Sequence, residues 1–400
     1  MDYKHDIING NYKNDNNGSK NDEKPGDFFK LVFFNWYNLI NKNKIYYMND
    51  DLEKKLNESI NYYIIKYKDK VDYRVSDPFN SKEGIINLLN DCYIISFIQI
   101  LFHTPKFLDI LKILKKEDDS IIHKLISVSE YPFNAQYFYE LKQSFERFNP
   151  EYSKPWSNDS QEFGIDLINY LITEQKELFD DNYDNEILNC QNEEELIKNK
   201  KIIYENFINT YQTKLNEIGK LFLFNQINIF CSKSFRKPNI SPNLHMELTL
   251  QKMMNYNNYI KIEDLIDIKY GQDKTDKIKF ANPEQIVIKS KLASLPNILI
   301  ISINRVLNNE RINDSLIKFN DILDLGKYID KDLFDDDNKN TKYQLYAINK
   351  CIHGYKSSHY KCSIKIDNKW FIFDDDKIGF NYSEGNISGS VVGLFYIRDK

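Results

Sequence analysis

Residues 84–101 read Gly84-Ile-Ile-Asn87-Leu-Leu-Asn90-Asp91-Cys92-Tyr93-Ile-Ile-Ser96-Phe-Ile-Gln99-Ile-Leu. From Cys92 onward the apolar residues recur with the spacing of a helix face, which predicts a helix packed against a core. Asn90 or Asp91 is the expected N-cap, so Cys92 falls in the first helical turn. Unpaired N–H groups and the positive end of the helix dipole favour a thiolate there. The segment therefore makes Cys92 a candidate nucleophile.

A second polar cluster lies far downstream, where two β-like runs flank a polar turn at residues 367–368. This pattern predicts a β-hairpin. With the turn at its centre, His359 pairs with Asp376. Alternation along the strands then places His359 and Asp374 on one face, within side-chain reach, and Asp375 on the other. A histidine oriented by a carboxylate is the usual arrangement of a general base.

Each feature also has a simpler interpretation. A cysteine at the head of an apolar helix is usually a small buried residue. A run of aspartates after a strand is usually a solvated turn. Together, however, the order Cys92, His359, Asp374 is what a papain-like catalytic set requires. Their separation along the chain predicts a large insertion between the two halves of the site.

The composition limits the classes of protein to consider. The 400 residues include 42% hydrophobic and 28% charged residues, which is typical of a globular protein. The net charge of −5 disfavours nucleic acid as a partner. The N-terminus is charged and lacks the apolar core of a signal peptide, and no apolar run reaches the ~18 residues of a membrane span. We expect a protein that binds neither nucleic acid nor membrane.

The cysteines are few and scattered, at positions 92, 190, 231, 351 and 362. Their odd number and wide spacing do not form a disulfide framework, which suggests a reducing compartment. No Cys-x-x-Cys pair is present, so the usual structural zinc site cannot form. We therefore expect a cytosolic or nuclear protein without a bound metal.

Composition shifts divide the chain into two parts. Residues 1–78 are predicted to be an N-terminal extension, disordered over 1–26 and helical over 28–68. Residues 79–400 form the predicted catalytic domain. Its first part is mostly helical to about Leu171, and an acidic insertion follows at 179–200. Strand patterns dominate later, which predicts an α+β fold. The expected strands are Leu221–Phe230, His245–Leu250, Gln285–Ile288, Ile298–Ile303 and Tyr343–Ile348.

These motifs resemble those of the ubiquitin-specific protease family of cysteine deubiquitinases, from about Gly84 to Arg398. The segment around Cys92 is similar to the family's cysteine box. The other similar segments are the Asp159-Ser-Gln-Glu-Phe163 helix, the strand from Leu295-Pro296 to Arg305, the histidine box (Tyr343-Gln-Leu-Tyr-Ala347, His359-Tyr360 and Trp370-Phe-Ile-Phe-Asp-Asp375) and the closing strand Gly393–Arg398.

The resemblance implies a papain-like, right-hand fold with a helical thumb, β fingers and a β palm. It implies that Cys92 is the nucleophile, His359 the general base and Asp374 the residue that orients it. Asn87 would donate a hydrogen bond to the oxyanion, and Asp375 would support the site. The implied activity is thiol-dependent hydrolysis of isopeptide or peptide bonds at the C-terminal glycine of ubiquitin. Ubiquitin or ubiquitinated proteins are the implied partners of a monomer that needs no cofactor.

The chain departs from the family pattern beside the nucleophile. Leu89 stands where the family usually has glycine, Asp91 where it has threonine, Ile95 where it has asparagine, and Ser358 where it has glycine. A leucine resists the positive φ that glycine permits, and the charge of Asp91 should raise the pKa of the thiol.

The segment Leu221–Leu250 resembles the first finger hairpin but keeps only Cys231 of the usual zinc-binding pair, which predicts zinc-free fingers. Two alternatives remain open. Besides an active deubiquitinase, the chain could be a catalytically weak or silent scaffold that binds ubiquitin, or a protease for another ubiquitin-like modifier.

Overall fold

A computed structural model describes residues 84–88, 90–114, 120–154, 156–173, 190, 192–211, 215–231, 236–250, 259–271, 274–276, 286–306, 312–334, 340–353, 358–381 and 386–399. The predicted N-terminal extension, residues 1–78, lies outside these ranges, and so does Leu89.

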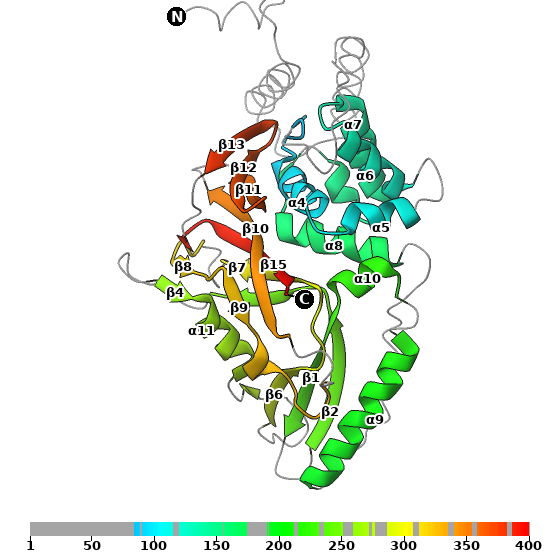
Figure 1. Ribbon diagram of the computed structural model, residues 1–400, viewed down its shortest axis with the longest axis vertical. Helices are drawn as coiled ribbons and strands as arrows, with labels where there is room; N and C mark the ends of the chain where they lie inside the picture. Colours follow the sequence, from blue (N-terminus) through cyan, green and yellow to red (C-terminus); the bar gives the residue numbers. More distant parts are fainter. Residues whose placement is uncertain are drawn as a thin grey trace, which may run out of the picture.

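Helices form the first part of the described chain, as predicted for residues up to Leu171, and group together beside one end of a long sheet (Figure 1). They are α4 (Cys92–Phe102), α5 (Phe107–Leu114), α6 (Ile121–Glu130), α7 (Ala135–Ser144) and α8 (Ser160–Thr173), with short 3-10 turns η2 (Phe145–Arg147) and η3 (Pro150–Ser153) between α7 and α8.

The central helix α4 is buried almost all round rather than along the single face that its periodicity predicts. It packs between α8 on one side and strands β11 (Ser358–Ile366) and β12 (Lys369–Asp374) on the other. The crossing with α8 is close because Gly164 faces the ring of Phe97. A Cβ on Gly164 would lie 2.1 Å from that ring, so only glycine fits without rearrangement.

A long mixed sheet forms the palm-like centre of the molecule. Its strand order is β13-β12-β11-β10-β15-β7-β3, and β9 pairs with β10. The neighbours are antiparallel except for β3, which runs parallel to β7. The strands not yet delimited are β3 (Met246–Thr249), β7 (Ile298–Asn304), β9 (Ile322–Asp324), β10 (Lys342–His353), β13 (Lys377–Asn381) and β15 (Val391–Arg398).

Two hydrophobic cores cover opposite faces of this sheet. One core joins the helices to the sheet, for example through Phe97 of α4 against Phe395 of β15. The other lies under α11 (Ile262–Ile266) and includes Ile301 and Leu394. Because both faces are covered, β7 and β15 are almost wholly buried, and they read as continuous apolar runs in the sequence.

A second sheet extends from the palm like fingers, with α9 along one face (Figure 1). Its strand order is β2-β1-β6-β5, and Ile227 and Ile229 of β1 pack with Phe207 of α9. A third, small sheet has the order β14-β8-β4. The bounds are β1 (Phe224–Cys231), β2 (Arg236–Asn243), β4 (Tyr259–Lys261), β5 (Lys274–Asp276), β6 (Ile286–Leu292), β8 (Leu316–Lys318), β14 (Ile387–Ser388), α9 (Glu193–Tyr211), α10 (Glu217–Phe222), η5 (Asp267–Gly271) and η6 (Gly326–Tyr328).

The α+β prediction is confirmed, with two local corrections. Leu221 and Phe222 end helix α10 rather than begin a strand. This helix begins after Asn216, whose side chain accepts a hydrogen bond from the N–H of Gly219. The strand predicted at His245–Leu250 is shorter and belongs to the palm, where it pairs with β7. The prediction of zinc-free fingers stays a prediction, since residues 232–235 next to Cys231 lie outside the described ranges.

Among the described residues no single helix is long and apolar enough to cross a membrane. Helices α4 and α5 meet the length and composition test only when joined, and they are bent by 92° relative to each other.

Candidate active site

Cys92 is the first residue of α4, as predicted, and Asp91 is its N-cap. The side chain of Cys92 is buried, with 5% exposure. The backbone of Tyr360 hydrogen-bonds to its sulfur, and so does the backbone of Tyr93. Since Tyr360 follows His359 in β11, the helix start lies directly against the strand that carries the predicted general base.

Helix α8 fixes α4 in this position. The carboxylate of Asp159 accepts hydrogen bonds from the backbone N–H groups of Gln161 and Glu162, which caps α8. The next residue, Ser160, donates through Oγ to the carbonyl of Tyr93 at 2.7 Å. Asn349 of β10 donates in turn to Ser160 Oγ at 2.8 Å. The Asp-Ser-Gln-Glu-Phe motif therefore ties the cysteine helix to the palm.

The predicted hairpin of β11 and β12 is confirmed, with its turn at residues 367–368. Cys362 pairs with Phe373 and Ile366 with Lys369. Asp367 and Asn368 have φ of 50° and 60°, the left-handed values that a two-residue hairpin turn needs and that Asp and Asn tolerate.

His359 and Asp374 meet across this hairpin. The Nε2 atom of His359 lies 2.6 Å from Oδ1 of Asp374, and both side chains are 41% exposed. The predicted contact between the two is confirmed. Because Nε2 is engaged by the carboxylate, Nδ1 is the ring nitrogen that remains for proton transfer.

The expected position of Asp375 is wrong. Strand β12 ends at Asp374, which pairs with Lys377, so Asp375 and Asp376 form a tight turn instead of continuing the strand. The predicted pairing of His359 with Asp376 is therefore not formed. The φ of Asp375 is 56°, and this left-handed conformation turns its side chain back toward the site. Ligand atoms of His359, Asp374 and Asp375 all lie within 4.8 Å of one another.

The segment before the nucleophile is fastened to the same turn. The N–H of Ile85 donates to the carbonyl of Asp375 at 3.1 Å. Gly84 lies so close that an added Cβ would be 2.2 Å from that carbonyl oxygen. Glycine at this position lets the cysteine segment and the aspartate turn approach each other.

Asn87 and Asp91 are also in contact. The N–H of Asp91 donates to Oδ1 of Asn87 at 3.2 Å. The side chain of Asp91 makes an ion pair with Lys142 of α7, and it gives α4 no side-chain cap. Sequence reasoning missed Lys142, because a pair between residues 51 positions apart leaves no signal in either segment.

The pKa of the Cys92 thiol is raised to about 12, mainly by burial; the charges of Asp375 and Asp91 contribute to the rise, and the backbone hydrogen bonds at the sulfur oppose it. Asp91 therefore raises the pKa of the thiol, as predicted, but burial raises it more. The sequence also led us to expect a thiolate at the helix start. That expectation is wrong for the unliganded protein, because loss of solvation outweighs the helix end.

We therefore predict that free Cys92 reacts slowly with iodoacetamide at neutral pH and that its alkylation accelerates as pH rises toward about 12. The rate should grow roughly tenfold per pH unit, because only the thiolate reacts. Mass spectrometry of the Cys92 peptide over a pH series measures this. A plateau already reached near neutral pH would contradict it.

His359, Asp374 and Asp375 supply nitrogen and oxygen atoms of the kind that bind zinc. A metal ion there would compete with the His359–Asp374 hydrogen bond. We predict that added Zn²⁺ inhibits any activity of this site, that EDTA restores it, and that Mg²⁺ has a much weaker effect, because it prefers oxygen ligands. Initial rates with and without chelator test this, and equal inhibition by both ions would contradict it.

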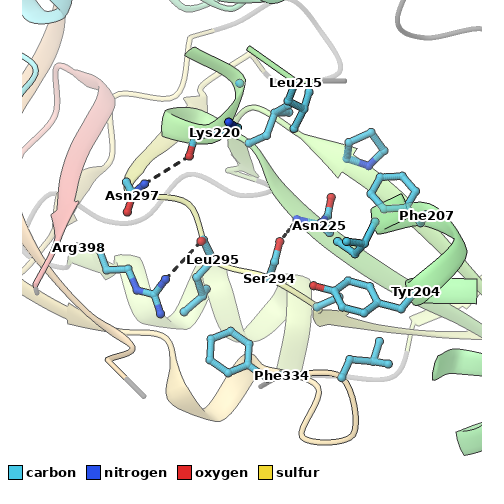
Figure 2. A pocket seen from close by; sticks show the side chains of 16 residues that line it. Tyr204, Phe207, Leu215, Lys220, Asn225, Ser294, Leu295, Asn297, Phe334 and Arg398 are labelled. Carbon is cyan, nitrogen blue, oxygen red and sulfur yellow. Dashed lines mark hydrogen bonds between the residues drawn. The ribbon is translucent and has the colours of Figure 1, made fainter. Parts of the chain in front are cut away.

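A cavity of about 420 Å³ lies elsewhere, where α9 and α10 meet the base of the fingers (Figure 2). Tyr204, Phe207 and Phe334 line one part of it, and Arg398 lines another. None of the candidate catalytic residues is among its lining residues. The cavity is therefore separate from the candidate active site.

A cysteine at the head of a buried helix, set against a strand whose histidine contacts an aspartate, is the arrangement that the sequence predicts for a papain-like cysteine hydrolase. The chain belongs to the ubiquitin carboxyl-terminal hydrolase family, whose model matches residues 83–396.

Similar curated proteins include ubiquitin carboxyl-terminal hydrolase 12 of Saccharomyces cerevisiae, which is 33% identical over 115 residues. That match covers 27% of this chain and 9% of the yeast protein. Putative ubiquitin carboxyl-terminal hydrolase 11 of Arabidopsis thaliana is 34% identical over 119 residues, which cover 28% of this chain and 13% of the plant protein. The matched region is thus a small part of these relatives' length.

Solved structures share the fold. A chain of the SAGA Ubp8/Sgf11/Sus1/Sgf73 DUB module bound to ubiquitin aldehyde aligns with a TM-score of 0.58 and 19% identity, covering 88% of this chain and 77% of that one. A chain of the same module bound to monoubiquitin gives a TM-score of 0.59 and 18% identity, covering 88% and 76%.

Proposed function

We propose that this protein is a thiol-dependent deubiquitinase that hydrolyses isopeptide or peptide bonds at the C-terminal glycine of ubiquitin. One observation carries the chemistry. Nε2 of His359 lies 2.6 Å from Oδ1 of Asp374, and His359 belongs to β11, the strand that packs against the Cys92 helix. Family membership supports ubiquitin as the substrate, and related modules were solved with ubiquitin bound.

In the proposed reaction, Nδ1 of His359 removes the proton from Cys92 as the sulfur attacks the carbonyl carbon of the terminal glycine. The buried thiol holds its proton until then, so a substrate in place determines when the charge forms. Asp374 keeps the imidazole oriented and stabilises its positive charge. Because the resting thiol keeps its proton, it reacts slowly with other electrophiles.

Asn87 is the oxyanion donor in this proposal. Its Oδ1 accepts from the N–H of Asp91, which fixes the amide and leaves the Nδ2 group to donate to the tetrahedral oxyanion. His359 then protonates the departing amine, which leaves a thioester on Cys92. Water deprotonated by His359 hydrolyses the thioester and releases the ubiquitin carboxylate.

Asp375 supports the same site in this proposal. Its carboxylate lies near both His359 and Asp374, and its backbone carbonyl holds the segment before Cys92. Asp375 therefore helps to align the two halves of the catalytic set.

A fluorogenic amide at the C-terminus of ubiquitin tests the proposal, with matched amides of NEDD8 and SUMO as a substrate panel. Turnover of the ubiquitin amide supports a deubiquitinase. Preference for another modifier would keep the mechanism and change the substrate. Binding of ubiquitin without turnover of any amide would favour the scaffold alternative and overturn the enzyme.

We further propose that the protein acts as a monomer in the cytosol or nucleus. All five cysteines lie among the described residues and none forms a disulfide, which suits a reducing compartment. A single chain supplies Cys92, His359 and Asp374, so no second copy is needed to complete the set. Light scattering on the purified protein and localisation of a tagged chain test these two points.

A further inference from the structure

We infer that Lys142 is a positioning residue of the active site, which holds the turn before Cys92 through its ion pair with Asp91. The inference rests on the proposed function for its catalytic meaning, but the contact itself lies outside the catalytic set. Asp91, which forms this pair, stands directly before Cys92, where the family pattern has an uncharged threonine.

Both partners of the pair are out of contact with water. The side chain of Asp91 has 0% exposure and that of Lys142 has 3%. Lys142 comes from α7, whose main contacts are with α6, η2 and η3. A buried carboxylate is strongly disfavoured without a cation at hydrogen-bond distance. Asp91 therefore depends on a residue of another helix to remain where it is.

The backbone of Asp91 transmits this constraint to the functional groups. Its N–H holds Oδ1 of Asn87 at 3.2 Å, and its carbonyl accepts the hydrogen bond from the N–H of Ile95 at 2.9 Å, within the first turn of α4. Cys92 is the next residue. A displacement of Asp91 would thus move the proposed oxyanion donor and the nucleophile together.

The charge of Lys142 also matters to the thiol. The charged groups that act on Cys92 are Asp91 from its own turn and Asp375 after β12, and the His359–Asp374 pair lies on the hairpin against which α4 packs. Asp375 and Asp91 both oppose a negative charge on the sulfur. Lys142 offsets the second of these carboxylates, so its loss should make ionisation of Cys92 more difficult.

Lys142→Met tests the inference, with Asp91→Asn/Lys142→Met as the variant that removes both charges. The matched control is Lys200→Met, which breaks a second buried ion pair, to Asp330 at 2.9 Å, between α9 and the loop after η6. The measurements are kcat and KM on ubiquitin amide, and iodoacetamide alkylation of Cys92 at a fixed, mildly alkaline pH. Thermal unfolding reports whether each variant is folded.

We expect Lys142→Met to lower kcat and the alkylation rate by roughly tenfold, the effect of one pKa unit, with little change in KM. The double variant should recover most of both losses, because it removes the carboxylate that required the cation. Lys200→Met should lose stability without changing the alkylation rate. This combination separates positioning of the thiol from a general loss of stability.

A folded Lys142→Met protein with wild-type alkylation would overturn the inference, and so would a folded double variant without recovery. If Lys142→Met does not fold, the double variant decides alone, since it must then fold and alkylate at close to the wild-type rate. Alkylation needs no ubiquitin. A wild-type protein that fails on ubiquitin amide would therefore refute the proposed function while the role of Lys142 is still measured.

Discussion

Replacing Cys92 with alanine is expected to abolish hydrolysis of ubiquitin amide, with a fall in kcat of at least roughly 10⁴-fold, the scale seen when a catalytic nucleophile is removed. The sulfur of Cys92 lies against the backbone of Tyr360, the residue that follows His359 in β11. The measurement is steady-state turnover at saturating substrate.

Cys231→Ala is the matched control for this prediction. Cys231 is half-buried in β1 of the fingers, away from the catalytic hairpin, and should be dispensable for turnover. The Cys92→Ala protein should still bind ubiquitin, since only the sulfur is lost. Residual turnover within tenfold of the wild type would show that Cys92 is not the nucleophile.

Asp374→Asn is expected to have the next largest effect, a fall in kcat of roughly 10²- to 10⁴-fold. The amide can keep a hydrogen bond to Nε2 of His359, but it cannot stabilise the imidazolium that forms when Cys92 gives up its proton. The KM for ubiquitin amide should change little, because the contact concerns proton transfer rather than binding.

A split between kcat and stability distinguishes this from a structural defect. The Asp374→Asn protein should lose kcat while its thermal unfolding midpoint changes little, because the side chains of His359 and Asp374 are both 41% exposed. Asp376→Asn is the control, since Asp376 lies in the adjacent turn and belongs to none of the proposed catalytic roles. If the two variants were equally impaired, Asp374 would have no special role.

Much of the fold was accessible from the sequence because its signals are local. The Cys92 helix, the buried strand at Ile298–Ile303 and the hairpin around residues 367–368 each carry their own periodicity or turn residues, and each was correctly placed. The contact between His359 and Asp374 followed from hairpin register alone. Such features need no knowledge of the rest of the chain.

The errors share a physical cause, which is that tertiary contacts override local patterns. Strand alternation placed Asp375 away from the site, but the chain turns there with a positive φ that alternation does not foresee. The helix-start argument favoured a thiolate, but the burial of Cys92 by surrounding elements dominates its pKa. The pairing of Lys142 with Asp91 depends on how α7 packs, which neither segment reveals.

Covalent capture by a reactive ubiquitin shows whether Cys92 is the nucleophile for the ubiquitin C-terminus. The wild-type protein is mixed with ubiquitin that carries an electrophile in place of its terminal glycine carboxylate, and the product is analysed by intact mass and by peptide mapping. We predict a stoichiometric adduct of one ubiquitin, linked to Cys92. A folded protein that forms no adduct, or forms one at another cysteine, would show that Cys92 is not this nucleophile.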